Sequence, residues 1–185
     1  TAGRTTDVMR RAFAGIYQGR PGPVMVEIPS DVALEEVPEE AIHWGKNFPN
    51  LGSAGDPKDV ESAAHALVTG RYPVIHAGQG VLYADASDEL VELAELLSIP
   101  VMTTLLGKSA FPETHPLALG SGSGVMSGTL YHFMQRSDVI FGIGCSFTKH
   151  GMSMNIPDGK YTIASNWHFS KSIFLMFICA FVEPN

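Results

Sequence analysis

Short apolar runs alternating with amphipathic helical patterns constrain the fold of this chain more than any other feature. After Asp56, four such runs follow in order, at residues 73–77, 101–104, 139–143 and 161–164. Continuous apolar strands separated by amphipathic helices are typical of a parallel sheet that helices cover on both faces. The pattern therefore predicts an α/β fold with a doubly wound parallel sheet.

The helices between these strands carry recognisable start and stop signals. Asp56-Pro57 is an N-cap followed by proline at the first helical position, and the helix that it predicts ends near Gly70. Two further helices are expected at residues 87–97 and 129–136. The apolar residues expected to face the sheet from the first two helices are Val60, Ala63, Ala64, Leu67, Val68, Leu90, Leu93, Ala94 and Leu97.

The first 44 residues follow a different pattern. Thr6 and Asp7 are expected to cap an amphipathic helix that runs through residues 8–16 and stops at Gly19. A Pro- and Gly-rich turn leads to an expected strand at 24–28, which Pro29 closes. Residues 31–43 are acidic and weakly periodic, and residues 45–55 have the Gly, Asn, Pro and Ser content of a linker, so a domain boundary is expected there.

Composition excludes several classes of function. With 185 residues, 45% hydrophobic and 17% charged, the chain is of globular type, and its net charge of −7 gives no basic field for nucleic acid. Its two cysteines form no CxxC pair, which favours a reducing, cytoplasmic location and disfavours a zinc site. The longest apolar run, residues 173–182, is shorter than the roughly 20 residues that cross a bilayer, so no membrane association is expected.

Glycines and small residues follow the predicted strands. In open parallel sheets, ligands bind at the carboxyl ends of the strands, and glycine there lets backbone amides approach an anion. A nucleotide diphosphate is one candidate ligand, and the alternative is that the glycines only satisfy turn geometry. The segments concerned are 78–80, 103–108, 120–124, 128–129 and 144–146.

The stronger catalytic fingerprints are missing from the sequence. Tyr83 stands where GxGxxG needs its third glycine, 107–109 lacks the upstream glycine of a P-loop, and no GxSxG, HExxH or CxxC occurs. His76 is interpreted as a hydrogen-bonded core or edge histidine, Cys145 as a small buried apolar residue and Lys108 as a solvated lysine. We therefore predict no catalytic constellation and no metal site.

The order of motifs resembles one enzyme family. The segments that carry the resemblance are 10–13, 19–24, 27–32, 73–80, 99–108, 111–112, 115–117 and 119–120. Together they are similar to the thiamine-diphosphate-dependent enzymes, acetolactate synthase-like subgroup. The resemblance implies a pyrimidine-domain tail at 1–44, a linker at 45–56, a central Rossmann-like domain at 57–166 and a divergent apolar tail at 167–185.

The resemblance also implies what the parent enzyme does. Such enzymes are transferases or lyases that decarboxylate 2-oxo acids or join them to an acceptor, using thiamine diphosphate and Mg²⁺, as homodimers or homotetramers. The activating glutamate of the family lies upstream of this sequence, and its metal and diphosphate motif lies downstream. The chain by itself is accordingly expected to be inactive.

The central domain of relatives binds FAD, ADP or nothing. By position, the contacts that the resemblance implies are Gly78, Gln79, Gly80, Thr104, Leu105, Gly128, Thr129 and Gly144. Residues 144–149 depart from the Gly-x-Arg-Phe-Asp-Asp of FAD-binding members, losing an arginine and two carboxylates. Two alternatives remain open: a stand-alone nucleotide-binding module without catalysis, and an assembly-mediating domain with an empty crevice.

Overall fold

The computed structural model describes residues 2–17, 22–39, 55–149 and 151–165. The chain divides into two compact units, residues 1–51 and 52–185, which are considered separately here. Residues 45–54 of the linker expected at 45–56, and the whole of the divergent tail expected at 167–185, lie outside the described residues.

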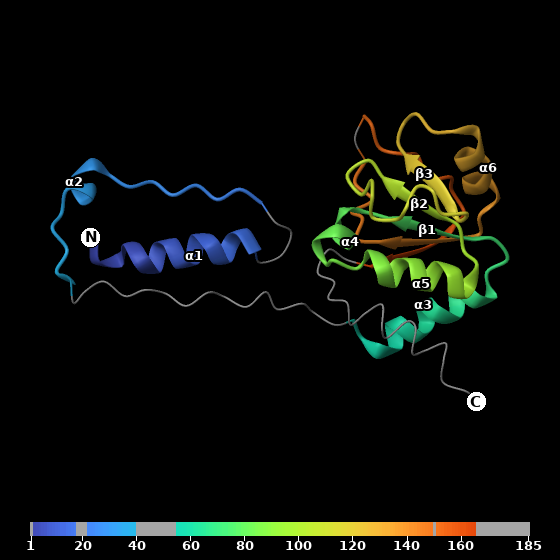
Figure 1. Cartoon of the computed structure of the whole chain (residues 1–185), viewed down its shortest axis with the longest axis horizontal. Coiled ribbons are helices and arrows are strands. Elements are labelled where there is room, and N and C mark those ends of the chain that lie inside the picture. Colours follow the sequence, from blue (N-terminus) through green and yellow to red (C-terminus); the bar gives the residue numbers. More distant parts are fainter. Residues whose placement is uncertain (1, 18–21, 40–54, 150, 166–185) are drawn as a thin grey trace. The chain divides into compact units, whose positions relative to one another are not determined.

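The second unit is built on a five-stranded sheet (Figure 1). The strand order is β3-β2-β1-β4-β5, and every neighbouring pair is parallel. This confirms the predicted α/β class and the parallel sheet. The strands are β1 (Pro73–Ala77), β2 (Val101–Thr104), β3 (Ala118–Gly122), β4 (Val139–Ile143) and β5 (Tyr161–Ser165).

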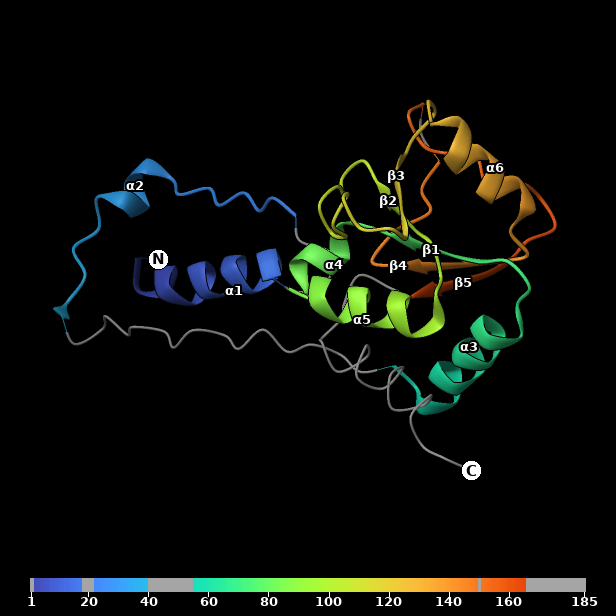
Figure 2. The same ribbon diagram turned by 45° about the vertical axis from the view of Figure 1, so that its right-hand side comes forward.

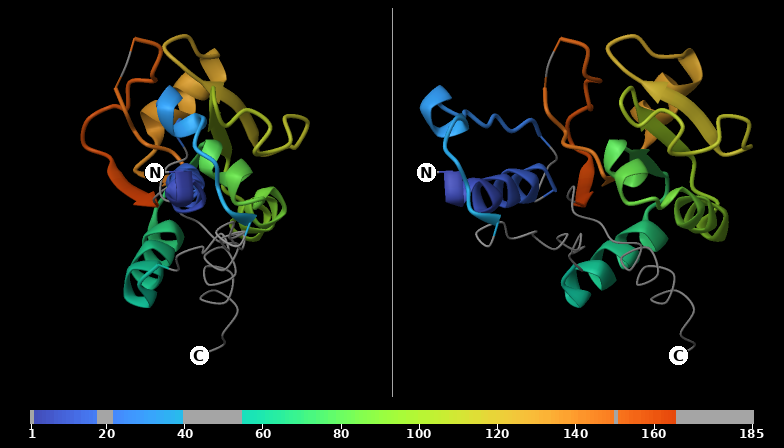
Figure 3. Two further views of the ribbon diagram at one scale, coloured as in Figure 1. Left: turned by 90° about the vertical axis from the view of Figure 1, so that its left-hand side faces the viewer. Right: turned by 60° about the vertical axis from the view of Figure 1, so that its left-hand side comes forward.

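Helices cover both faces of this sheet (Figures 2 and 3). Helices α3 (Pro57–Thr69) and α5 (Ser87–Leu97) pack with Ile75 and Phe141 into one core cluster. Helix α6 (Gly128–Arg136) packs with Val74 and Ile140 into the other. Successive strand residues thus alternate between two buried layers, which is why the strands are apolar throughout.

Capping side chains fix where two of the covering helices, α3 and α6, begin. Asp56 accepts a hydrogen bond from the Lys58 amide at 2.9 Å and caps α3, as its position before Pro57 predicted. Ser127 accepts one from the Leu130 amide at 3.2 Å and caps α6, so this helix starts at Gly128, one residue earlier than expected.

Two elements of this unit escaped the sequence analysis, and one core residue was misplaced. The Gly-rich segment 120–124, interpreted as a ligand loop, overlaps the end of β3, and Gln79–Tyr83 forms the short helix α4. Val68, expected to face the sheet, is 59% exposed, and the buried side of α3 consists of Val60, Ala63, Ala64 and Leu67.

The first unit contains a 3₁₀ turn at Ala2–Arg4, α1 (Thr5–Tyr17) and α2 (Ser30–Ala33). The helix predicted at 8–16 is confirmed, but it begins at Thr5, so Thr6 and Asp7 lie inside its first turn and do not cap it. The strand predicted at 24–28 is wrong. A strand is stable only when its backbone pairs with a neighbour, and no strand partner is present in the described part of this unit. Its apolar side chains are open to solvent, with Met25 82% and Ile28 55% exposed.

Among the described helices, none combines the length and the apolar character needed to cross a bilayer.

Candidate functional site

The carboxyl ends of β1 and β4 mark the switch point of the sheet. From β1 the chain adds β2 and β3 on one side, and it then returns to place β4 and β5 on the other. Ligands of open α/β sheets bind outside the strand ends at such a point. Two of the predicted site segments, 78–80 after β1 and 144 after β4, meet here.

Glycines at this switch point pack against one another. A methyl group on Gly80 would lie 2.6 Å from the Cα of Gly144, and one on Gly107 would lie 2.7 Å from the carbonyl carbon of Gly78. Gly144 also has a φ of +62°, in the left-handed region that favours glycine. The geometry therefore requires glycine at these positions whether or not a ligand is present.

The backbone amides of this contact are already engaged. Gly78 donates to the carbonyl of Ile143 at 2.8 Å, and Gly80 donates to the carbonyl of Gly144 at 2.9 Å. These two amides are consequently not free to hold a diphosphate. Gln79 begins α4, which is only five residues long, and is partly buried.

The predicted contacts at the end of β2 play different roles. The Thr104 hydroxyl accepts a hydrogen bond from the Gly107 amide at 2.9 Å and so fixes the turn after the strand. Leu105, in contrast, is 44% exposed. Thr104 is thus a turn-forming residue, and Leu105 offers an apolar surface next to it.

Gly128 and Thr129 form the first turn of α6. Both are exposed, and a methyl group on Gly128 would meet nothing within 4 Å. Helix α6 follows β3, which β2 separates from β1 in the sheet. This helix start is open and has the polarity that favours an anion.

His76 differs from the hydrogen-bonded histidine that the sequence suggested. It lies in the central strand β1, is 6% exposed, and neither ring nitrogen has a hydrogen-bond partner among the described residues. Burial lowers the pKa of His76 to about 4, because the charged form would lose its hydration. The ring is therefore neutral at pH 7.

Phe147 is a residue of the site that the sequence analysis missed. Its backbone φ is +50°, and its ring meets that of His76 edge-on, with 5.7 Å between the ring centroids. The ring also fills the space beside Gly142, where any side chain would collide with it. No sequence pattern announces a non-glycine residue with positive φ, so only the coordinates identify this contact.

Cys145 and Lys108 match their predicted structural roles. Cys145 is 6% exposed, and burial raises the pKa of its thiol to about 12, which leaves the thiol protonated. Lys108 is exposed and lies 3.5 Å from the Glu113 carboxylate. In the parts of the chain that the structure describes, no three His, Cys, Asp or Glu side chains are arranged to hold a metal ion.

Comparison with known proteins shows which family this domain belongs to. Residues 60–165 match the family model for the central domain of thiamine pyrophosphate enzymes. The chain is 40% identical over 148 residues to the probable acetolactate synthase large subunit of Methanocaldococcus jannaschii, covering 77% of this chain and 25% of the relative. It is 37% identical over 158 residues to the glyoxylate carboligase of Escherichia coli O157:H7, covering 84% and 26%.

A solved structure agrees in fold. Benzoylformate decarboxylase from Polynucleobacter necessarius superposes with a TM-score of 0.75 at 22% identity, over 97% of this chain and 36% of that one. The chain thus spans about a quarter of the length of the curated relatives that it matches. On the family match and these relatives, the chain belongs to the thiamine pyrophosphate enzymes of the acetolactate synthase-like family, and residues 60–165 are their central domain.

Proposed function

We propose that this chain is the middle region of a thiamine-diphosphate-dependent enzyme that decarboxylates or joins 2-oxo acids in a homo-oligomer. The observation that carries the proposal is the match of residues 60–165 to the central domain, together with relatives of which the chain covers only about a quarter. The cofactor supplies the carbon–carbon bond chemistry in such enzymes. The chain contributes scaffold, and its buried free Cys145 suits a reducing cytoplasm.

Residues 1–44 are proposed to be the end of the preceding, pyrimidine-binding domain. The described part of this unit leaves apolar side chains open, with Phe13 52% and Met25 82% exposed. A domain normally buries such side chains in its own core. Their exposure is what a segment separated from the rest of its domain would have.

The reactive groups are proposed to lie elsewhere in the parent enzyme. A general base works best when its pKa is near the operating pH, and a cysteine nucleophile must reach the thiolate form. The pKa of His76 is lowered to about 4, which makes it a weak base at pH 7, and that of Cys145 is raised to about 12, which keeps its thiol protonated. Magnesium and thiamine diphosphate would accordingly be held by residues outside the described part of this chain.

A nucleotide, FAD or ADP, is proposed to bind at the carboxyl edge. The open start of α6 at Gly128 and Thr129 supports an anion there. The backbone amides of Gly78 and Gly80 are already hydrogen-bonded, which favours the alternative that these glycines serve turn geometry only.

Nucleotide binding is tested by titrating FAD and ADP into the 185-residue chain by calorimetry. We expect Gly128→Glu to weaken binding about tenfold, because its carboxylate would oppose the phosphates. Gly3→Glu, at an equally open position in the first unit, is the control and should change nothing. Absence of binding to either nucleotide would favour the assembly-mediating alternative.

Catalysis is tested on the same preparation with thiamine diphosphate, Mg²⁺ and a panel of 2-oxo acids. We expect no release of carbon dioxide above the rate without protein. Release that depends on the chain would contradict the assignment of the reactive groups to missing regions, while leaving the family membership intact.

A further inference from the structure

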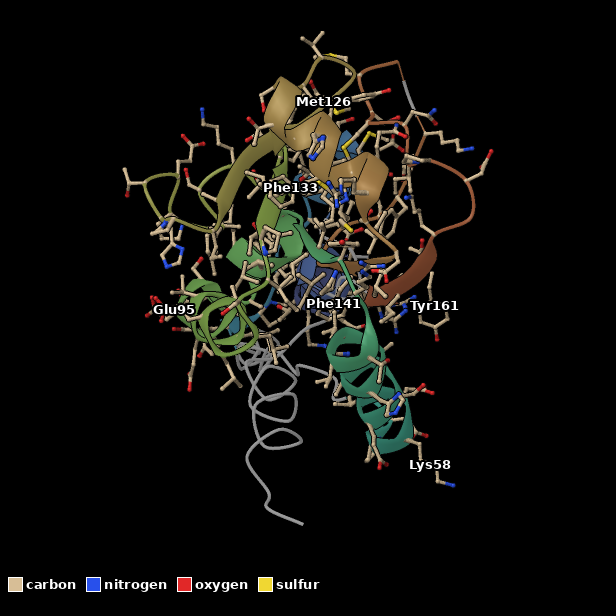
Figure 4. The ribbon with its side chains drawn as sticks, turned by 90° about the vertical axis from the view of Figure 1, so that its right-hand side faces the viewer. Lys58, Glu95, Met126, Phe133, Phe141 and Tyr161 are labelled. Carbon is tan, nitrogen blue, oxygen red and sulfur yellow. The ribbon has the colours of Figure 1, made fainter. Side chains whose placement is uncertain are left out.

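A cavity of about 640 Å³ opens at the end of the sheet opposite the switch point. It lies at the amino ends of β1 and β2, beside Pro73 and Pro100, where α3, α5 and α6 end. Figure 4 looks onto this edge, with Phe133 of α6 labelled between α6 and the strand ends. The volume is within the range of small-molecule sites, roughly 300–1,000 Å³. None of the predicted site residues lines it.

The walls of the cavity are largely apolar. Leu67 and Ile99 are buried in its floor, and each is 2% exposed. Around the mouth, Val68, Leu96 and Phe133 are 59%, 48% and 40% exposed. Covering such side chains gains roughly 25 cal/mol per Å² of apolar surface removed from water. The cavity therefore favours a ligand with an apolar body.

Two arginines give one side of the mouth a positive charge. The guanidinium carbons of Arg71 and Arg136 lie 5.2 and 5.1 Å from the centroid of the Tyr72 ring, and Arg136 donates to the Tyr72 hydroxyl at 3.3 Å. Arg71, Tyr72 and Arg136 all line the cavity. Stacking on one ring holds both guanidinium groups at the same site.

No acidic side chain among the described residues forms an ion pair with either arginine. The described lining contains no Asp or Glu, and neither arginine lies within 4.0 Å of a described carboxylate. Asp138 is adjacent and sets one negative charge against the two positive ones, and its carboxylate oxygens accept hydrogen bonds from the backbone amides of Arg71 and Tyr72 at 2.7 and 2.8 Å. The hydrogen bond from Arg136 and the charges of both arginines lower the pKa of Tyr72, as a positive potential requires. In a chain of net charge −7, this is a localised anion-attracting site.

We propose that this cavity binds a small amphipathic anion, with its apolar body against the exposed apolar side chains at the mouth and a carboxylate or phosphate group at Arg71 and Arg136. Guanidinium groups pair with either head group through charged hydrogen bonds. The inference does not depend on the proposed function, because the nucleotide would bind at the opposite end of the strands.

The test is a calorimetric titration of the 185-residue chain with octanoate and octyl phosphate. Octanol and octyltrimethylammonium are the controls, since they share the alkyl body but lack the negative charge. We expect at least one anion to bind at least about tenfold more tightly than octanol, as charged hydrogen bonds to arginine would give. The preferred anion identifies the head group.

Variants locate the binding. Arg71→Met and Arg136→Met together keep apolar stems but remove the charges, and we expect them to abolish the preference for the anion over octanol. Lys58→Met removes an exposed cation at the other end of α3 and should change nothing. Denaturation midpoints of the variants verify that each is folded.

Several outcomes would overturn the proposal. They are equal binding of octanoate, octyl phosphate and octanol, no binding of either anion up to about 10 mM, and anion binding that survives the double arginine variant. Sedimentation equilibrium tests whether a second copy of the chain occupies the cavity instead. A dimer that the double arginine variant dissociates would assign this surface to that second copy. FAD or ADP binding at the carboxyl edge should be unaffected by the double variant, so the two proposals fail independently.

Discussion

Glycines in the second unit are required for two different physical reasons, which substitution separates. Gly144→Ala places a methyl group 2.7 Å from the Val81 nitrogen at a φ of +62°, and we expect a loss of about 3 kcal/mol in the free energy of unfolding. Gly120→Ala has a φ of +83° but open space, so the loss should be about 1 kcal/mol.

Gly128→Ala is the matched control for these substitutions. It has neither a positive φ nor a neighbour within 4 Å, so alanine should be neutral or stabilise by up to about 1 kcal/mol. Urea denaturation measures all three variants. Equal losses for Gly144→Ala and Gly120→Ala would show that close packing at the switch point contributes little.

His76 makes stability depend on pH. Its pKa is lowered from 6.5 to about 4 in the folded chain, so the unfolded chain binds the proton more readily between these values. The free energy of unfolding should therefore fall by about 2 kcal/mol from pH 7 to pH 5, at about 1.4 kcal/mol per unit of pKa.

The His76→Leu variant tests the origin of this dependence. It should lose most of the fall and be more stable at pH 7, because two unpartnered buried nitrogens are removed. His65→Leu, at an exposed position of α3, should keep the wild-type pH profile. An unchanged profile in His76→Leu would exclude His76 as the cause.

At the scale of single residues, the sequence predicted whether a residue is buried or lies in a turn better than it predicted which residues surround it. Glycines after each strand, a buried Cys145 and an exposed Lys108 follow from composition and position. The missing partners of His76 and the positive φ of Phe147 do not, because both depend on segments that meet only after folding. The mutual engagement of the Gly78 and Gly144 segments is likewise a tertiary property.

Among the elements, α3 offers a direct test of the capping signal. Asp56→Ala removes the hydrogen bond to the Lys58 amide and should cost about 1 kcal/mol in the free energy of unfolding. Asp59→Ala removes a carboxylate from the same first turn but no cap, so it should cost less, about 0.5 kcal/mol. Equal effects in urea denaturation would show that charge, and not capping, matters at this helix start.

The elements that the sequence misjudged share a physical cause. Segment 118–122 contains two glycines and no β-branched residue, so only its pairing with β2 makes it a strand. Segment 24–28 has the apolar composition of a strand but no partner in the described residues. In these two segments the presence or absence of a pairing strand decided the structure against the local propensity. Strands β1, β2 and β4 have both an apolar sequence and pairing neighbours, and they were predicted at the correct residues.

At the scale of the whole molecule, we expect the second unit to be stable without the first. Every residue of the two core clusters lies at or beyond Val60. A chain shortened to residues 52–185 should therefore unfold cooperatively, with the urea midpoint of the longer chain. A loss of cooperative unfolding would show that residues 1–51 contribute to the core.

The glycine contacts at the switch point also have a genetic consequence. A methyl group added to Gly78, Gly80 or Gly144 would collide with the backbone of another of these three residues. We therefore expect the three positions to be constrained together during evolution. A second substitution there should add little harm once the first has forced the segments apart. Descendants of this sequence would then keep the three glycines together or lose them together.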